Sequence, residues 1–424
     1  MYGLIPVAFL GLAFGLPRAG WCGGKILNLF KIIKKEKIKG RRVAVLQTIH
    51  GGVKTPVFMP VATQAAVKNL TSEELGDLGA QIILGNTYHL WLRPGTEVIK
   101  KTVLLRPASG GTSEGQGGLH KFMNWPGPIL TDSGGYQIFS LARHRKISSE
   151  GVEFCDPING KRYFLTPEKS IQIQLDLGSD IIMVLDECAA YPCSYEEAEK
   201  AVRRTTQWAK RCFKYFRRKV KNKKNKPLLF GIVQGSVFKD LRQKSAKELL
   251  EIGFSAQGGL ASGWDGYAIG GVAVGEPRKY LGKVLEWVLP LLPQNKPRYL
   301  MGLGRPEEIV SAVLSGIDMF DCVIPTREAR HGRIYKYRFS IFNILPEGRQ
   351  FSDKKFYETL QIKSSKFAKD FRPIDENCEC YACQNYSRAY LNHLFKTREP
   401  LALRLATIHN LKFYLDLMEK LREF

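Results

Sequence analysis

Within residues 316–327, GIDMFDCVIPTR, the carboxylate of Asp321 interrupts the apolar run formed by Met319, Phe320, Val323 and Ile324. A buried carboxylate is costly unless it is hydrogen-bonded, coordinated to a metal or used in chemistry. The stretch therefore predicts a short buried strand that ends in a functional acid, with Asp321 as the candidate nucleophile. The structural alternative is a carboxylate that only forms a salt bridge, with Arg327 or Arg330 as its partner.

Seven other apolar runs end in polar or glycine residues in the same way. In chain order, the eight runs are VFMPVAT (57–63), QIILGNT (81–87), PILTDSGG (128–135), DIIMVLDE (180–187), LLFGIVQG (228–235), YAIGGVAV (267–274), RYLMGLG (298–304) and MFDCVIPT (319–326). Helical patterns separate them, which indicates a parallel sheet covered by helices. Eight such units predict an α/β fold of the (β/α)8 TIM-barrel type. A doubly wound open sheet is the alternative, but no GxGxxG follows the first strand.

Local signals place some element ends. Thr71 is an expected helix N-cap, and Glu74, three residues later, completes a capping box. Ahead of the first barrel strand, VAVLQTIHGGVKTP (43–56) predicts a hairpin that turns at Gly51 and Gly52. We expect this hairpin to close one end of the barrel.

The charge balance narrows the class of partner. The 424 residues are 44% hydrophobic and 25% charged, which is ordinary for a globular enzyme. Lys and Arg number 64 against 40 Asp and Glu, and the net charge of +24 favours an anionic macromolecular partner such as nucleic acid. Most of the nine cysteines are scattered, which favours free thiols in a reducing cytoplasm over a disulfide framework.

The N-terminus differs in character from the rest of the chain. Residues 1–16, MYGLIPVAFLGLAFGL, resemble the apolar part of a signal peptide, but no basic segment precedes them and the run is short for a membrane span. We expect an atypical extension over 1–29, the catalytic barrel over 30–335 and a C-terminal subdomain over 336–424, with no membrane partner. A secretory segment is the alternative for the extension.

In a (β/α)8 barrel, the chemistry lies at the C-terminal ends of the strands. The polar and glycine residues there are Asn86, His89, Asp132, Ser133, Asp186, Glu187, Gln234, Gly270, Gly271, Met301, Gly302 and Asp321. Carboxylates and an amide, flanked by Tyr136 and Met301, suit a flat polar ring that is bound at its edge and stacked on its faces, such as a purine base. Core packing is the alternative for Tyr136 and for Met301.

A second motif, CECYAC, contains Cys378, Cys380 and Cys383. A CxCxxC motif with one further ligand is typical of a closed tetrahedral zinc site, which is structural when all four ligands are protein. His409 and His393 are the two candidates for the fourth ligand. One structural Zn²⁺ ion is therefore the predicted cofactor of the C-terminal helical subdomain.

Together, these motifs resemble one family. The runs are TDSGGYQIFSL (131–141), LDEC (185–188), GIVQGS (231–236), AIGGVAVGE (268–276) and MFDCVIPTR (319–327), with the cysteine motif after them. They resemble those of queuine tRNA-ribosyltransferase, the tRNA-guanine transglycosylase family, over roughly 45–415. The resemblance implies a modified TIM barrel with a zinc subdomain. It also implies exchange of the wobble guanine, position 34, of tRNAs with GUN anticodons for a 7-deazaguanine base.

The resemblance also implies residue roles. Asp321 aligns with the family's nucleophile, which attacks C1′ of the ribose, and Asp132 aligns with its general acid/base. Base binding is implied for Asp132, Tyr136, Asp186, Gln234, Gly270, Gly271 and Met301, tRNA binding for Arg327 and Arg330, and zinc binding for Cys378, Cys380, Cys383 and His409. Base replacement with retained geometry requires two inversions, and therefore a covalent ribosyl–enzyme intermediate.

Several features bear on substrate and partners. The chain looks like the bacterial type, which implies preQ1 as the incoming base, tRNAs for Asp, Asn, His and Tyr, and a homodimer. Val272 stands where we expect leucine, so a queuine-salvaging enzyme remains an alternative. A non-catalytic tRNA-binding partner subunit is disfavoured because Asp321 and Asp132 are both present. A zinc-dependent hydrolase is disfavoured because the chain lacks a catalytic ligand set such as His-x-His.

Four segments depart from the barrel pattern. The basic run 203–226 is either a solvated helix face or a tRNA contact. Stretches 102–116 and 256–265 are rich in Gly and Ser, and a further excess lies near 337–360. We expect 256–265, which leads into the Gly270 loop, to bulge outward as a surface loop, because long loops add little entropic cost.

Overall fold

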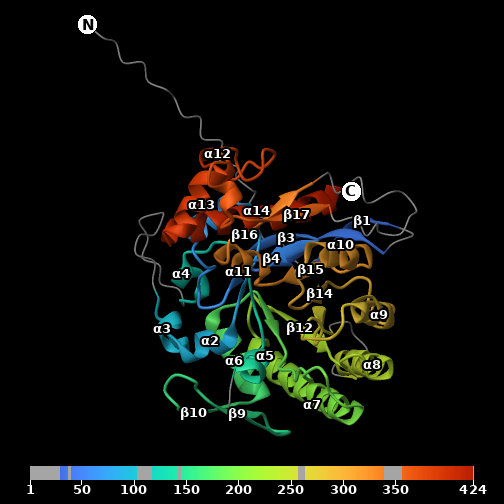
Figure 1. Ribbon diagram of the computed structural model, residues 1–424. Helices are drawn as coiled ribbons and strands as arrows, with labels where there is room; N and C mark the ends of the chain where they lie inside the picture. Colours follow the sequence, from blue (N-terminus) through green and yellow to red (C-terminus); the bar gives the residue numbers. More distant parts are fainter. Residues whose placement is uncertain are drawn as a thin grey trace.

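The computed structural model describes residues 29–36, 40–102, 117–141, 145–255, 263–338 and 356–423 (Figure 1). Apart from Leu29, the predicted extension over 1–29 lies outside the described residues. The larger parts of the three predicted insertions, 103–116, 256–262 and 339–355, also lie outside them.

Eight short parallel strands form the barrel, as predicted. They are β4 (Val57–Met59) continued by β5 (Val61–Ala62), β6 (Ile83–Gly85), β7 (Ile129–Thr131), β11 (Ile181–Met183), β12 (Leu228–Val233), β13 (Gly266–Ile269), β14 (Arg298–Leu300) and β15 (Met319–Asp321). The first stretch is divided at Pro60, so that β4 pairs with β15 while β5 pairs with β6. This double pairing closes the ring. Every strand residue is buried except Asp321, as expected for a sheet covered by helices.

Helices cover the outside of the ring. They are α1 (Ser72–Asp77), α2 (Thr87–Leu92), α3 (Thr96–Lys100), α4 (Leu119–Met123), α5 (Gly135–Leu141), α6 (Pro167–Leu177), α7 (Tyr195–Val220), α8 (Lys239–Ser255), α9 (Lys279–Val288), α10 (Pro306–Leu314) and α11 (Ile324–Arg330). The predicted capping box of α1 is present, because Thr71 accepts from the Glu74 N–H and the Glu74 side chain accepts from the Thr71 N–H. The apolar face of α7 lies on the barrel, and most of its basic residues are exposed on the outer side.

An antiparallel sheet precedes the barrel, formed by β1 (Phe30–Lys35), β2 (Arg42–Thr48) and β3 (Gly51–Thr55). The predicted hairpin is correct, but its predicted turn is wrong. The turn consists of Ile49 and His50, while Gly51 and Gly52 already belong to β3. The physical reason is a long-range contact: the backbone N–H of His50 donates to Asp180 at 2.9 Å, and so does its ring Nδ1, at 2.8 Å.

A second antiparallel sheet, which the sequence did not predict, follows α5. It consists of β8 (Arg145–Ile147), β9 (Val152–Cys155) and β10 (Arg162–Leu165). The rings of Phe154 and Tyr163 stack in this sheet, with centroids 5.7 Å apart, and Trp91 of α2 packs edge-on against both. Aromatic packing therefore attaches this sheet to the barrel.

The C-terminal part consists of β16 (Arg333–Tyr337), β17 (Tyr357–Gln361), a 3-10 helix (Ser365–Phe367), α12 (Tyr381–Asn385), α13 (Arg388–Lys396) and α14 (Pro400–Glu423). In Figure 1, α12 and α13 lie together at one end of the molecule. Helix α14 packs on the barrel, where the Tyr414 hydroxyl donates to the Gly304 carbonyl at 2.6 Å and Arg422 donates to the Pro56 carbonyl at 2.9 Å. Among the helices of the described ranges, none combines the length and apolarity that crossing a bilayer requires.

Candidate active site and metal cluster

Asp132 and Asp321 lie at the same rim of the barrel. Asp132 directly follows β7, and Asp321 is the last residue of β15. Burial raises the pKa of Asp132 to about 6, hydrogen bonds to the carboxylate oppose this rise, and the negative charge of Asp321 adds to it. Burial and the charges of both aspartates also raise the pKa of Tyr299 far above its ordinary value. Strands far apart in the sequence thus bring the two predicted catalytic residues within electrostatic reach of each other.

Hydrogen bonds hold Asp132 in one orientation. Its Oδ2 accepts from Asn86 Nδ2 at 2.5 Å and from Gln137 Nε2 at 2.7 Å, and its Oδ1 accepts from the Thr87 N–H at 2.8 Å. These donors stabilise the ionised form, while burial stabilises the protonated form. A pKa of about 6 makes both forms accessible near neutral pH, as an acid that must later act as a base requires.

The two carboxylate oxygens of Asp321 differ in their contacts with the described residues. Its Oδ1 accepts from the Tyr299 hydroxyl at 2.5 Å and from the Gly302 N–H at 2.8 Å. Among the described residues, no other residue donates a hydrogen bond to its Oδ2, and Asp321 keeps partial exposure. Burial raises the pKa of Asp321, and hydrogen bonds from the Tyr299 hydroxyl, the Gly302 N–H and its own backbone N–H limit the rise. Oδ2 is therefore the oxygen that is left for a further contact.

The salt-bridge alternative for Asp321 does not match the structure. Arg330 donates to the Thr326 carbonyl at 2.9 Å, and Arg327 lies 4.0 Å from the Glu328 carboxylate. In the described part of the chain, no ion pair includes Asp321. Both arginines belong to α11, directly after β15, with Arg327 exposed and Arg330 partly exposed.

Asp186 and Gln234 form a buried polar pair at the ends of β11 and β12. Gln234 Nε2 donates to Asp186 Oδ2 at 2.7 Å, and the Ser133 hydroxyl donates to Asp186 Oδ1 at 2.9 Å. Burial raises the pKa of Asp186, and both hydrogen bonds oppose this. The pair offers carboxylate and amide groups side by side, which suits the donor and acceptor atoms of a purine edge.

The predicted glycines lie directly against this pair. A Cβ atom at Gly270 would lie 2.6 Å from Gln234 Nε2, and Gly271 has a φ of +61°. Only glycine fits both requirements without moving Gln234. Arg242, which sequence reasoning missed, donates to the carbonyls of both glycines.

The two predicted stacking residues differ in environment. The Tyr136 side chain is 49% exposed, so core packing does not explain it. Met301 is partly buried against the hydrophobic core, so packing accounts for part of its surface. Their roles as stacking partners stay predictions.

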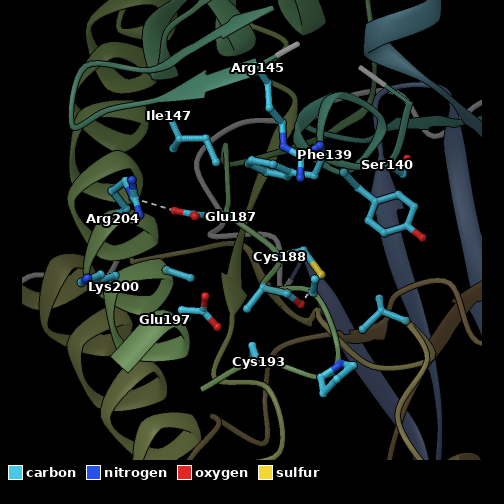
Figure 2. Close-up of a pocket in the computed structure, with 16 residues that line it drawn as sticks. Phe139, Ser140, Arg145, Ile147, Glu187, Cys188, Cys193, Glu197, Lys200 and Arg204 are labelled. Atoms are coloured by element: carbon cyan, nitrogen blue, oxygen red, sulfur yellow. Dashed lines mark hydrogen bonds and ion pairs between the residues drawn. The ribbon is translucent and has the colours of Figure 1, made fainter. Parts of the chain in front are cut away.

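A cavity of about 440 Å³ is lined by Tyr136 and by Glu187 and Cys188 of the LDEC motif (Figure 2). Tyr136, Cys188 and Val274 line one part of it, and Glu187 and Arg204, which form an ion pair at 2.6 Å, line another. The LDEC motif indicated this region of the barrel rim. The second wall of the cavity is formed by residues of α7, whose position could not be predicted from the sequence.

The four predicted zinc ligands form one cluster. The ligand atoms of Cys378, Cys380, Cys383 and His409 lie within 4.8 Å of one another. His409 Nδ1 is 3.1 Å from Cys383 Sγ and 3.7 Å from Cys380 Sγ. Its other nitrogen, Nε2, donates to the Tyr335 carbonyl at 2.6 Å, which leaves the Nδ1 lone pair directed at the sulfur atoms. Three thiols and an oriented imidazole suit a tetrahedral metal ion.

The competing candidate, His393, is not in this cluster. It lies exposed on α13, whereas His409 is buried on α14. Of the two alternatives that sequence reasoning left open, only His409 joins the cysteines.

A second group of ligand-type residues, His50, His120 and Asp180, was not predicted. The imidazole rings are stacked, with centroids 3.6 Å apart. Since the nitrogen lone pairs lie in the ring planes, stacked rings direct them side by side and not toward one point. His50 Nδ1 and His120 Nε2 contact different oxygens of Asp180, at 2.8 and 3.0 Å. We interpret this group as a hydrogen-bonded attachment of the β2–β3 hairpin to the barrel.

A (β/α)8 barrel with two carboxylates at one rim, beside a buried carboxylate–amide pair, suits an enzyme of the glycosyl-transfer class. Comparison with known proteins specifies the family. The family model for queuine tRNA-ribosyltransferase matches residues 37–424. The queuine tRNA-ribosyltransferases of Pelotomaculum thermopropionicum and Desulforudis audaxviator are 49% and 48% identical to this chain over 393 and 395 residues, covering 93% of each chain. That of Staphylococcus aureus strain JH9 is 49% identical over 394 residues, 93% of this chain and 91% of the relative.

The chain belongs to the queuine tRNA-ribosyltransferase family. This confirms the family that the motifs resembled, and with it the enzyme class, a tRNA-guanine transglycosylase, which is a pentosyltransferase.

Proposed function

We propose that this protein exchanges the guanine at position 34 of tRNAs with GUN anticodons for preQ1, through a covalent ribosyl–enzyme intermediate, in queuosine biosynthesis. The observation that carries the proposal is the placement of Asp132 and Asp321 at one barrel rim, each with its own set of hydrogen-bond donors. Family membership supports the reaction class.

In the first step, Asp321 Oδ2 attacks C1′ of the target ribose. The C1′–N9 bond breaks, a C1′–O bond forms, and protonated Asp132 gives its proton to the departing guanine. Tyr299 and the Gly302 N–H hold the other oxygen, so the attacking oxygen has a fixed direction. This positioning avoids the entropic cost of orienting a free carboxylate.

In the second step, the same groups act in reverse. Asp132, now ionised, takes the proton from N9 of the incoming base, N9 attacks C1′, and the bond to Asp321 breaks. Two inversions at C1′ retain the original linkage geometry. The pKa of Asp132, about 6, lets one residue serve both steps near neutral pH.

Base recognition falls to the buried groups beside these aspartates. Asp186 and Gln234 face the donor and acceptor edge of the base, and N–H groups of the Gly270–Gly271 loop approach its carbonyl oxygen. Tyr136 and Met301 stack on its faces. Stacking offsets part of the cost of turning the nucleotide out of the anticodon stack.

We also propose how the tRNA is bound, which tRNAs are substrates, and in which oligomeric state and compartment the protein acts. Arg327 and Arg330 follow the nucleophile on α11, close enough to contact anticodon phosphates, and the net charge of +24 favours tRNA. The tRNAs are those for Asp, Asn, His and Tyr, the protein acts as a homodimer, and the reaction takes place in the cytoplasm.

Zn²⁺ is the proposed metal of the cluster formed by Cys378, Cys380, Cys383 and His409. With four protein ligands, it would have a structural role and no open position for a substrate. It would connect α12 and the segment before it to α14, which packs on the barrel.

Queuine is the second candidate for the incoming base, and the cavity beside Cys188 and Val274 favours it. At about 440 Å³, the cavity has room for a larger 7-substituent. Incubating undermodified tRNA with equal amounts of labelled preQ1 and labelled queuine distinguishes the two candidates. Preferential incorporation of queuine contradicts the preQ1 assignment but leaves the chemistry intact.

The covalent intermediate is tested on a denaturing gel after mixing enzyme, tRNA and a guanine analogue. Wild-type protein is expected to give a protein–RNA adduct, and Asp321→Asn is expected to abolish it while still binding tRNA. Asp77→Asn, an exposed aspartate on α1, serves as the control and keeps the adduct. An adduct that survives Asp321→Asn would assign the nucleophile to another residue.

A further inference from the structure

Arg242, near the start of α8, is a fully buried arginine, 0% exposed. Burial lowers its pKa to about 10, and the charge of Glu276 acts in the opposite direction without a direct ion pair. Among the described residues, no carboxylate lies within ion-pair distance of this guanidinium. A buried cation that is bonded only to neutral groups is costly, so its position calls for a reason beyond packing.

Arg242 connects the ends of two neighbouring barrel strands. After β12, Nη1 donates to the Val233 carbonyl at 3.2 Å and Nε donates to the Ser236 carbonyl at 2.8 Å. After β13, Nη1 donates to the Gly270 carbonyl at 2.6 Å and Nη2 donates to the Gly271 carbonyl at 2.8 Å. One planar guanidinium thus determines the orientation of two consecutive peptide groups in the glycine loop.

That orientation has a direct consequence for the N–H groups of the same peptides. The peptide bonds after Gly270 and Gly271 are trans, so each N–H points opposite to its carbonyl. With both carbonyls directed at Arg242, the N–H groups of Gly271 and Val272 point away from it. Within the described ranges, neither N–H donates to another protein group. The loop therefore presents two adjacent, oriented donors beside Gln234.

We propose that Arg242 is the positioning residue for recognition of the 6-oxo group of the base, because it fixes the Gly271 and Val272 N–H donors in the direction of that oxygen. This inference rests on the proposed base exchange. Lysine cannot replace arginine here, since one ammonium group cannot reproduce the planar fork that reaches four carbonyls. Arg242 itself does not touch the base.

The test compares two free bases, guanine and 2-aminopurine, which lacks the 6-oxo group. Their dissociation constants are measured on the full-length protein, using 2-aminopurine fluorescence and competition by guanine. Arg242→Lys is expected to weaken guanine binding roughly 10-fold to 100-fold, the range for losing one or two oriented hydrogen bonds. Binding of 2-aminopurine is expected to change less than about threefold, because it has no oxygen for these donors to reach.

Arg298 provides the matched control. It is also buried, burial also lowers its pKa to about 10, and it also donates to carbonyls, those of Leu289 at 3.2 Å and Leu292 at 2.8 Å. It lies at the start of β14, at the opposite end of the barrel from the site. Arg298→Lys is expected to lower the melting temperature but to leave the ratio of the two dissociation constants unchanged.

Arg242→Ala with added methylguanidinium gives a second measurement. The cation is expected to restore guanine affinity and to leave 2-aminopurine affinity unchanged. Equal weakening of both bases in Arg242→Lys, or an unchanged ratio, overturns the inference. The inference is also overturned if both Arg242 variants fail to fold while Arg298→Lys folds, because this result assigns Arg242 a purely structural role. If the wild-type protein itself does not discriminate between the bases, the proposed base recognition fails instead.

Discussion

Tyr299 donates its hydroxyl hydrogen to Oδ1 of Asp321 at 2.5 Å, from a position 22 residues earlier on the neighbouring strand. The bond stabilises the ionised carboxylate and fixes its orientation. Because the bond is made to Oδ1, it leaves Oδ2 for another contact. Tyr299 is therefore a positioning residue for the proposed nucleophile.

Tyr299→Phe tests this relationship. Loss of the hydroxyl raises the pKa of Asp321 further and frees its rotation, so we expect adduct formation to slow by about 10-fold. The single-turnover rate of adduct formation measures this effect, with the tRNA dissociation constant as the control. A variant that forms adduct at the wild-type rate would show that the Gly302 N–H alone is sufficient to orient the Asp321 carboxylate.

The pH dependence of the two half-reactions follows from Asp132, whose pKa burial raises to about 6. Adduct formation needs its protonated form, so the rate of adduct formation is expected to fall tenfold per pH unit above about pH 6. Transfer to the free base needs the carboxylate and has the opposite dependence. Rapid-quench measurement of each half-reaction between pH 5 and 8 tests this, and identical profiles would exclude a single acid/base residue.

Asn86→Ala should shift both profiles. Asn86 Nδ2 donates to Asp132 Oδ2 at 2.5 Å and stabilises the ionised form. Without it, the pKa of Asp132 rises, and we expect both midpoints to move upward by about one pH unit, the equivalent of ~1.4 kcal/mol. Gln137, which also donates to Oδ2, keeps the side chain in place. A shift toward acid pH would contradict the assigned direction of this hydrogen bond.

The barrel could be predicted from sequence because its strands are buried on both faces and appear as apolar runs. Asp321 was recognisable because a carboxylate in such a run is costly. The roles of Asp132, Asp186 and Gln234 came from the family resemblance, since pattern alone places polar groups at a rim without assigning chemistry.

The remaining features depend on contacts between residues distant in the chain. The hairpin turn lies at His50 because Asp180, 130 residues later, accepts its hydrogen bonds. Arg242 occurs in an ordinary amphipathic helix, and its contact with Gly270 exists only once two strands are neighbours. Nothing within either local sequence distinguishes these residues.

Metal removal has a predictable outcome at the proposed zinc cluster. His409→Ala removes an imidazole whose Nδ1 lies 3.1 Å from Cys383 Sγ. We expect loss of bound zinc and a melting temperature lower by about 5 °C or more, because metal binding contributes to folding free energy. Zinc per chain and thermal unfolding are the measurements. His393→Ala, an exposed histidine on the neighbouring helix, is the control and should keep one zinc ion. Equal metal loss in both variants would exclude His409 as the specific ligand.

We expect the stability of the fold at low pH to depend on Asp180, which lies far from the proposed active site. Burial opposes its ionisation, but hydrogen bonds from His120 and His50 outweigh burial and hold its pKa well below the ordinary value. Above about pH 4, the carboxylate is charged in the folded and unfolded states, so its stabilising contribution is fully present. Below that pH, the unfolded chain binds the proton first, and this contribution is lost.

Asp180→Asn places an amide N–H₂ against groups that donate, among them the Ile129 N–H and the His50 N–H. We expect it to lower the free energy of unfolding by about 2–4 kcal/mol at pH 7. Urea unfolding at pH 7 and at pH 3.5 tests both the loss of stability in Asp180→Asn and its dependence on pH. The gap between wild type and variant should narrow at the lower pH, because only the wild type loses a carboxylate contribution there. A gap that widens on acidification would mean that the histidines do not stabilise the ionised form of Asp180.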